Sequence, residues 1–387
     1  MKEITRDIYY IGFDNENADL FESQFKLSHG MAFNSYLIKD DKIAIIDAVE
    51  IEGKDIWFKA IEEVLDGKSP DYLVIEHMEP DHSGSVLEFV KKYPHAKIVT
   101  NPKSLALLNQ FFDYSFDEKV IVVKEYDKLV LGKHTLNFIF APMVHWPEVM
   151  MVYEEHSKTL FSADAFGKFG TTNTKDNWID EARRYYFGII SKYGFQVQSF
   201  LKKICDFKIE RICSLHGPVL DDDVCKYIEI YDMWSQYKSE DEKGVFIAYT
   251  SIYGNTKSAV MLLKKELEHL GVKDVEIRDL SRSDIYESLA LAFKYKKIVL
   301  ASTTYNNSIF PPMHDFLIRL VEHGLQDKTI GVIENGSWVP QTEKIIKTML
   351  IPCKNLQILE QCVHVKSGIK DINKEEIKAL AEALRKD

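Results

Sequence analysis

The sequence predicts an α/β protein of two domains. We expect a mixed domain over residues 1–243 and a doubly wound, parallel five-stranded sheet over residues 244–387. Strands and helices alternate regularly in the second half, as such a sheet requires. In the first half several connections are too short for helical crossovers, which favours antiparallel pairing. A charged stretch at residues 239–244 (SEDEKG) separates the halves.

Short apolar runs in the first half have the length and composition of buried strands. They lie at residues 43–47, 72–75, 97–100, 136–140, 150–153 and 211–215. Helices are expected between some of these strands, at residues 55–65 and 85–92. An aromatic segment with helical spacing, KYIEIYDMWSQYK at residues 226–238, is expected to end the first domain.

The second half begins abruptly with an apolar strand. Five strands are expected at residues 245–249, 275–278, 297–302, 329–333 and 356–363. The helices between and after them are expected at residues 257–270, 284–293, 312–323, 341–349 and from residue 374. This alternation predicts the doubly wound sheet.

Composition excludes several classes of protein. The formal net charge is −11 and no run of clustered Lys or Arg is present, so a nucleic-acid partner is not expected. No stretch reaches the roughly 18 apolar residues of a membrane span, and acidic residues interrupt the N-terminus where a signal peptide is apolar. We therefore expect a cytoplasmic protein without a membrane partner. The five cysteines include no C-x-x-C pair, which argues against a disulfide framework, a rubredoxin-type iron site and a zinc ribbon.

The strongest chemical signal is EHMEPDHSGS, residues 76–85, directly after an apolar strand. It holds four metal-ligand side chains within six residues: His77, Glu79, Asp81 and His82. In an extended segment the first three would share one face, since side chains alternate along a strand. A turn at Pro80 would then bring His82 in from another angle.

Three later residues also follow apolar runs: His145 in PMVHWPE, Asp164 in LFSADAFG and His216 in SLHGPV. A lone histidine at a strand end is more often structural than a ligand. Seven ligand-type residues at matched positions favour a metal site instead. Four His, two Asp and one Glu suit two metal ions about 3.5–4 Å apart with a bridging carboxylate.

This segment resembles the signature of the metallo-β-lactamase superfamily, whose hydrolytic members carry H-x-H-x-D-H. Here Glu79 replaces the middle histidine, and the resulting H-x-E-x-D-H is typical of flavodiiron proteins. The replacement exchanges an imidazole for a hard, anionic oxygen, which favours iron over zinc.

The resemblance implies two iron ions and divides the ligands between them. The iron nearer the flavin would be held by His77, Glu79 and His145. The second would be held by Asp81, His82 and His216, with Asp164 bridging the two. His29, in LSHGMAFNSYLI, matches a position where the family often places a histidine beside the open face of the iron, and so is a candidate catalytic residue. A purely structural role for His29 is equally open.

Three loops of the second half are expected to meet at the carboxyl edge of its sheet, where such sheets bind ligands. They are residues 250–256 (TSIYGNT), 302–313 (STTYNNSIFPPM) and 335–340 (NGSWVP). The first is neither a Walker A nor a G-x-G-x-x-G motif, but its hydroxyls and the following helix suit a phosphate. Tyr305 and Trp338 could stack on a flavin ring or merely pack. The candidate contacts are Ser251, Ile252, Tyr253, Gly254, Asn255, Thr256, Thr303, Thr304, Tyr305, Asn306, Asn335, Gly336, Ser337 and Trp338.

These loops resemble the FMN site of the flavodoxin-like domain of flavodiiron proteins, although NGSWVP departs from the Gly-rich form of many relatives. The resemblance covers essentially the whole chain. It implies a metallo-β-lactamase-like αββα sandwich followed by a flavodoxin-like domain.

The implied activity is that of an oxidoreductase with FMN and a non-haem diiron site. It would reduce dioxygen to water, as in oxygen detoxification, or nitric oxide to nitrous oxide. Because His29 matches a position that the family uses beside the substrate, dioxygen is the favoured substrate. The resemblance also implies a head-to-tail homodimer, with FMN of one subunit close to the diiron site of the other. Because the sequence closes on its flavodoxin-like half, a separate donor such as rubredoxin is expected.

Two other functions remain as alternatives. One is a zinc hydrolase of the glyoxalase II or lactonase kind, which needs no flavin. Glu79 and the second domain count against it. The other is a flavodoxin-like electron carrier with an inactive metal domain, against which the full ligand set counts.

Overall fold

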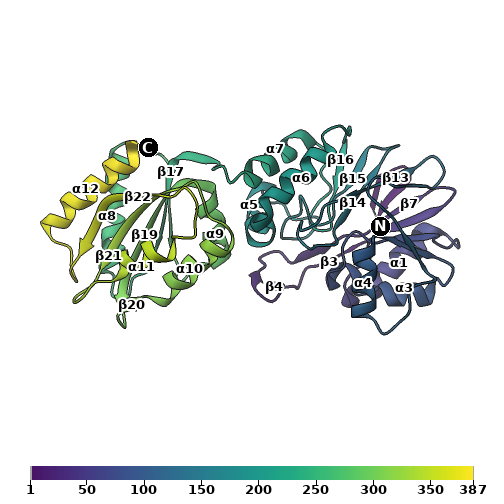
Figure 1. Ribbon diagram of the computed structural model, residues 1–387, viewed down its shortest axis with the longest axis horizontal. Coiled ribbons are helices and arrows are strands. Elements are labelled where there is room, and N and C mark those ends of the chain that lie inside the picture. Colours follow the sequence, from purple (N-terminus) through teal and green to yellow (C-terminus); the bar gives the residue numbers. More distant parts are fainter. Residues whose placement is uncertain (1, 387) are drawn as a thin grey trace. The chain divides into compact units, whose positions relative to one another are not determined.

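Two sheets form the centre of the first of two units in the computed structural model, which describes residues 2–386 (Figure 1). The first sheet has seven strands, antiparallel from β1 to β8 and parallel from β8 to β11. In spatial order they are β1 (Lys2–Thr5), β2 (Ile8–Tyr10), β7 (Tyr36–Lys39), β8 (Ile43–Ile46), β9 (Tyr72–Val74), β10 (Lys97–Thr100) and β11 (Val120–Val122).

The second sheet of this unit has five strands, of which only the last pair is parallel. They are β12 (Lys128–Val130), β13 (Thr135–Phe140), β14 (Met150–Glu154), β15 (Thr159–Phe161) and β16 (Arg211–Cys213). Buried side chains of both sheets form one core, with Ile38, Ile46 and Val74 on one side and Phe138 and Val152 on the other. The two sheets therefore pack face to face.

The described residues of the first unit form seven α-helices, which lie in its connections. They are α1 (Lys54–Leu65), α2 (Pro80–Ser83), α3 (Val86–Lys92), α4 (Pro102–Phe111), α5 (Trp178–Tyr185), α6 (Gly194–Ile204) and α7 (Val224–Ser235). Short 3-10 helices lie at Ile51–Gly53 and Ser191–Tyr193, and a π-helix lies at Tyr186–Ile190. Two small two-stranded sheets lie in the N-terminal region: β3 (Phe13–Asn15) pairs with β6 (Met31–Phe33), and β4 (Leu20–Phe21) pairs with β5 (Phe25–Lys26).

The second unit, which begins at Gln236, is a parallel sheet with the order β18-β17-β19-β21-β22. Its strands are β17 (Asp241–Tyr249), β18 (Val275–Asp279), β19 (Tyr295–Tyr305), β21 (Thr329–Asn335) and β22 (Gln357–Val365). A short β20 (Ser308–Ile309) pairs antiparallel with the end of β19. The connecting helices are α8 (Asn255–His269), α9 (Ile285–Lys294), α10 (Pro311–Glu322), α11 (Thr342–Met349) and α12 (Asp371–Lys386).

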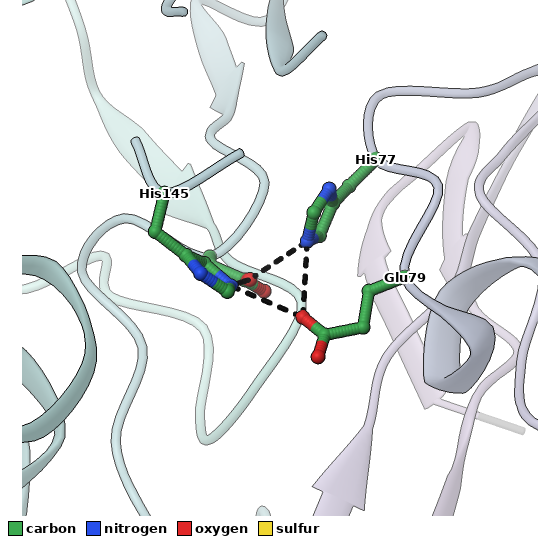
Figure 2. A group of neighbouring side chains, drawn as sticks. His77, Glu79 and His145 are labelled. Atoms are coloured by element: carbon green, nitrogen blue, oxygen red, sulfur yellow. Dashed lines mark hydrogen bonds and ion pairs between the residues drawn. The ribbon is translucent and has the colours of Figure 1, made fainter. Parts of the chain in front are cut away.

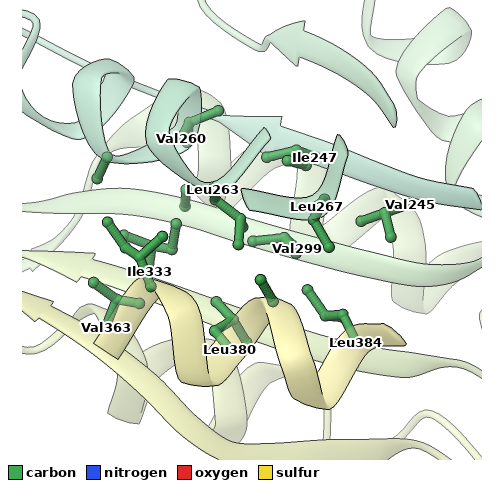
Figure 3. Packing of buried hydrophobic residues seen from close by; sticks show 14 of the residues in the cluster. Val245, Ile247, Val260, Leu263, Leu267, Val299, Ile333, Val363, Leu380 and Leu384 are labelled. Carbon is green, nitrogen blue, oxygen red and sulfur yellow. The ribbon is translucent and has the colours of Figure 1, made fainter. Parts of the chain in front are cut away.

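One face of this sheet packs against α8 and α12 (Figure 3). Val260 and Leu263 of α8 and Leu380 of α12 meet Ile247 and Val299 of the central strands, all fully buried. Apolar residues at helical spacing account for this packing, because they place one stripe of each helix on the sheet.

The predicted fold class is confirmed: an αββα sandwich is followed by a doubly wound parallel sheet with five main strands. All ten predicted elements of the second half are present, with ends shifted by a few residues. The short strands of the N-terminal region, the strands β11, β12 and β15, and the helices α2 and α4 to α6 were not predicted. Strands of two to four residues contain too few alternations to reveal a period. None of the described helices has the length and apolar character needed to cross a membrane.

Candidate metal centre and cofactor cavity

The seven predicted metal ligands lie in segments that follow strands of the sandwich. Behind them, Asp47 follows β8 with a φ of 52° and is fully buried. Its carboxylate accepts hydrogen bonds from the backbone N–H of Glu76 at 3.0 Å and of His77 at 3.4 Å. Burial raises the pKa of Asp47 to about 7. Asp47 thus fixes the backbone from which His77 projects.

The ligand segment is extended only as far as Glu79, whose ψ is 140°. From Pro80 the chain forms one helical turn, α2, so the expectation that Asp81 shares a strand face with His77 and Glu79 is wrong. Proline at the first helical position favours this turn, because its φ suits a helix and no N–H is lost. The turn carries Asp81 and His82 to a second group of ligands.

His77, Glu79, His145 and Asp164 form the first group, with one ligand atom of each within 4.8 Å of the others. Figure 2 shows the rings of His77 and His145 converging on the Glu79 carboxylate. Glu79 Oε2 lies 3.2 Å from His77 Nε2 and 3.1 Å from His145 Nε2. The side chains of Glu79 and His145 are slightly exposed, at 16% and 10%, whereas that of His77 is fully buried.

Asp81, His82 and His216 form the second group. The Nε2 atoms of His82 and His216 are 3.1 Å apart, and Asp81 Oδ2 lies 3.1 Å from the first and 3.3 Å from the second. The backbone carbonyl of Ala32 accepts a hydrogen bond from His216 Nδ1 at 2.7 Å, which leaves Nε2 facing the group.

Asp164 connects the two groups through its two oxygens. Its Oδ2 lies 3.0 Å from His145 Nε2 and 3.4 Å from His77 Nε2. Its Oδ1 lies 3.2 Å from His82 Nε2 and 3.5 Å from His216 Nε2. A buried carboxylate placed in this way has the geometry of a ligand shared by two ions.

The electrostatics of the cluster favour cations. Burial alone would lower the pKa of His82 and of His145, but neighbouring carboxylates outweigh it. The charge of Asp81 raises the pKa of His82 to about 10, and hydrogen bonds to Asp164 and Glu79 raise that of His145 to about 9. Asp81 Oδ1 is buried without a hydrogen-bond partner among the described residues. Unpaired buried acceptors are costly, so the donor set fits two divalent ions.

Glu148 contacts a predicted ligand and was not itself predicted from the sequence. Its Oε1 lies 2.8 Å from His77 Nδ1 and also accepts the backbone N–H of Met78. Carboxylates commonly orient metal-binding histidines in this way. The only sequence signal is its place three residues after His145, within the quoted PMVHWPE segment.

Aromatic rings cover the second group. The His216 ring centroid lies 5.1 Å from that of Phe21 and 5.6 Å from that of Tyr185. Glu22, next to Phe21 in the turn between β4 and β5, is exposed as a whole residue. Loss of solvent around its carboxyl and the charge of Glu79 nevertheless raise its pKa. The charge of Glu79 therefore acts on Glu22, a relationship that the sequence did not reveal.

His29 does not join the cluster. It is exposed after β5, and no hydrogen bond or ion pair links its ring to another described residue. Its backbone carbonyl accepts the N–H of Thr171 at 3.1 Å.

A cavity of about 530 Å³ lies at the carboxyl edge of the second sheet. All the predicted flavin contacts except Gly254 and Gly336 line it, and Asn307 and Ser367 were not predicted. The lining residues are Ser251, Ile252, Tyr253, Asn255, Thr256, Thr303, Thr304, Tyr305, Asn306, Asn307, Asn335, Ser337, Trp338 and Ser367. Ser367 follows the fifth strand, so a fourth strand end contributes to the cavity.

The backbone around this cavity is held by local hydrogen bonds. Gly254, with a φ of 89°, turns the chain into α8, and Ser251 Oγ accepts its N–H at 3.1 Å. Asn306 and Asn307 have φ values of 49° and 55° in the turn from β19 to β20, a conformation that asparagine tolerates. Trp338 is 75% exposed, which leaves its ring free to meet a ligand.

Comparisons with known proteins agree with this geometry. The model of the ODP family β-lactamase matches residues 31–217, the region with all seven predicted ligands. The structure superposes on rubredoxin oxygen:oxidoreductase from Desulfovibrio gigas with a TM-score of 0.92 and 24% identity, covering 100% of this chain and 98% of that one. The flavodiiron protein of Giardia intestinalis gives a TM-score of 0.87 at 22% identity, with 100% and 96% covered. These neighbours share the fold of both units.

Sequence relatives extend the match. An uncharacterized protein of Methanocaldococcus jannaschii is 30% identical over 81% of this chain and 80% of its own length. The nitric oxide reductase of Moorella thermoacetica is 29% identical over 91% of this chain and 90% of its own. The chain belongs to the flavodiiron protein family. This flavodiiron protein spans about half the length of two Synechocystis diflavin flavoproteins that it also matches, 48% and 52% of them.

Proposed function

We propose that this flavodiiron protein reduces dioxygen to water or nitric oxide to nitrous oxide at a non-haem diiron centre that FMN supplies with electrons. One observation carries the proposal: Asp164 directs one oxygen to each of two separate ligand groups. A site for a single metal ion would not need both groups of ligands. Such a centre, when bound, supplies two electrons and reduced FMN two more, which together suffice for dioxygen.

The donor set favours iron. His77, Glu79 and His145 would hold one ion, Asp81, His82 and His216 the other, and Asp164 would be shared. No thiolate is among them, and the carboxylate of Glu79 adds a hard anionic donor. The chain's contribution is to orient these donors: Glu148 fixes His77 and the Ala32 carbonyl fixes His216.

The surroundings of the cluster indicate where a gas would enter and where protons would come from. Phe21 and Tyr185 shield His216, whereas Glu79 and His145 keep some exposure. We therefore assign the approach of substrate to the side of Glu79 and His145. Glu22, in the turn between β4 and β5, is the side chain we assign to carry protons on that side, since loss of solvent and the charge of Glu79 both raise its pKa.

The cavity of the second unit would hold FMN. The N-terminus of α8, with the Ser251 and Thr256 hydroxyls, suits the phosphate, because free backbone N–H groups and the helix dipole favour an anion. Tyr305 and Trp338 offer ring faces to the isoalloxazine. Asn335 donates to Thr256 Oγ1 at 3.3 Å and so connects the first and third loops.

Electrons would come from a rubredoxin-type donor, as the name of the Desulfovibrio gigas neighbour, rubredoxin oxygen:oxidoreductase, suggests. We also propose a head-to-tail homodimer in which FMN of one subunit serves the metal centre of the other. Sedimentation of the purified protein tests the dimer. A mixed dimer of one metal-site variant and one flavin-site variant tests the exchange of electrons between subunits.

The decisive experiment measures metal and flavin in anaerobically purified protein, then turnover with each gas. We expect about two irons and one FMN per chain. His29 lies outside the cluster, so the structure adds nothing in favour of oxygen over nitric oxide. Zinc without flavin would support a hydrolase, and FMN without metal an electron carrier. The family of the relatives favours neither alternative.

A further inference from the structure

A third group of metal-ligand side chains lies in the second unit, separate from both sites described above. Glu343, Cys362 and His364 each offer one ligand atom, and these atoms lie within 4.8 Å of one another. None of the three lines the flavin cavity. We propose that they form a binding site for a borderline divalent cation, of which Zn²⁺ is the best match.

The strand and the helix together bring the three side chains to one place. Cys362 and His364 are two residues apart on β22 and so project to the same face. Glu343 comes from the first turn of α11, and its Oε2 lies 2.9 Å from His364 Nε2. Its backbone N–H donates to Glu334 Oε2 at 2.9 Å, which holds this turn against β21.

The donors match the cation. Zn²⁺ accepts sulfur, imidazole and carboxylate ligands at about 2.0–2.3 Å, so the three atoms, which lie within 4.8 Å of one another, need only small shifts to surround it. Cys362 is 8% exposed, whereas the side chains of His364 and Glu343 are 50% and 25% exposed. A cation can therefore reach the group from solvent, and water can complete four-coordinate geometry.

Without the cation the group is held by weak interactions. Lys347 Nζ lies 2.6 Å from Glu343 Oε1 and supplies the positive charge that the cation would replace. Surface ion pairs of this kind contribute only about 0–1 kcal/mol, so displacing Lys347 costs little. On binding, the Cys362 S–H bond is replaced by a sulfur–metal bond and the proton leaves to solvent, with no change of oxidation state.

Cobalt provides the test, since a thiolate bound to Co²⁺ gives a sulfur-to-metal charge-transfer band. The band is read as a difference spectrum during anaerobic titration of the full chain. The seven ligands of the proposed diiron centre include no sulfur, so cobalt there contributes no such band. We expect a band that saturates at one ion per chain and is displaced by Zn²⁺. Cys362→Ser should abolish it, whereas Cys353→Ser, which alters a partly buried thiol of the same unit, should retain it.

His364→Gln provides a second variant in case Cys362→Ser fails to fold, because His364 is half exposed. It should weaken cobalt binding by about tenfold or more. The proposal is overturned if the wild-type protein gives no thiolate band, if the band survives Cys362→Ser, or if His364→Gln binds as tightly as wild type. The cobalt readout does not depend on gas turnover. Failure of the cation-site proposal would therefore leave the proposed reductase activity untouched.

Discussion

Glu148 Oε1 lies 2.8 Å from Nδ1 of His77, and both side chains are buried. Burial alone would raise the pKa of Glu148, but its bond to His77 lowers it, so the group is a carboxylate. A carboxylate there keeps the proton of His77 on Nδ1 and leaves Nε2 directed at Glu79 and Asp164.

Glu148→Gln should therefore weaken metal binding at the first ligand group. The neutral amide orients the ring less strongly, and loss of such a partner typically costs about 10–100-fold in metal affinity. Iron retained after dialysis against a graded series of chelator concentrations measures the loss. Glu155→Gln, which removes a carboxylate paired with Lys128 at the surface, is the matched control. Equal iron retention in the two variants would contradict the role given to Glu148.

Glu79→His should change the metal preference while keeping the fold. It restores an imidazole in place of the hard oxygen donor, so zinc should displace iron and reductase turnover should be abolished. Metal analysis after growth in medium with both metals, together with circular dichroism, checks this. Normal iron content and turnover would show that ligand hardness does not set the metal.

Removal of the metals should make the first unit less stable as the pH rises. In metal-free protein the folded-state pKa values of His82 and His145, about 10 and about 9, lie above the roughly 6.5 of an unfolded histidine. Raised histidine pKa values contribute stability that is fully present below pH 6.5 and is lost as pH rises through the folded values. Metal binding needs neutral histidines and tightens with pH. The difference in Tm between loaded and metal-free protein should thus widen from pH 6.5 to 9.

Calorimetry of both forms across this range measures the effect, and His145→Gln supplies the control. In the metal-free state this variant should show a shallower fall of Tm with pH than wild type. The comparison also distinguishes the contribution of the cluster from that of Lys328 in the second unit. Burial lowers the pKa of Lys328 to about 7, so its contribution to stability rises with pH instead of falling. A Tm difference that stays constant with pH would contradict the prediction.

Trp338→Ala should weaken FMN binding about three- to tenfold, since an aromatic stacking contact contributes roughly 0.5–1.5 kcal/mol. The ring is 75% exposed and lines the cavity, so its removal should leave the fold intact. Recovery of flavin fluorescence on dilution gives the affinity. Phe195→Ala, which removes an 82% exposed ring from α6, is the control and should bind FMN normally. Unchanged affinity in Trp338→Ala would place the flavin ring elsewhere.

The sequence by itself determined the two-domain architecture and the residues that gather at each strand edge. The period of apolar residues along a short segment distinguishes a strand from a helix. The strands of the second sheet alternate with helices, so each strand could be predicted from its own segment. The ligand residues could be predicted because each one follows an apolar strand, and the ends of neighbouring strands meet in space.

Only the tertiary structure decided which side chains other than the predicted ligands face the cluster. Glu148 approaches His77 and Ala32 approaches His216 across long stretches of sequence, and no local pattern encodes such contacts. Glu22 lies in the turn between β4 and β5, and the charge of Glu79 acts on its carboxyl, although no sequence pattern connects the two residues. Ligand type is thus a local property of the chain, whereas the direction of each side chain depends on how distant segments pack.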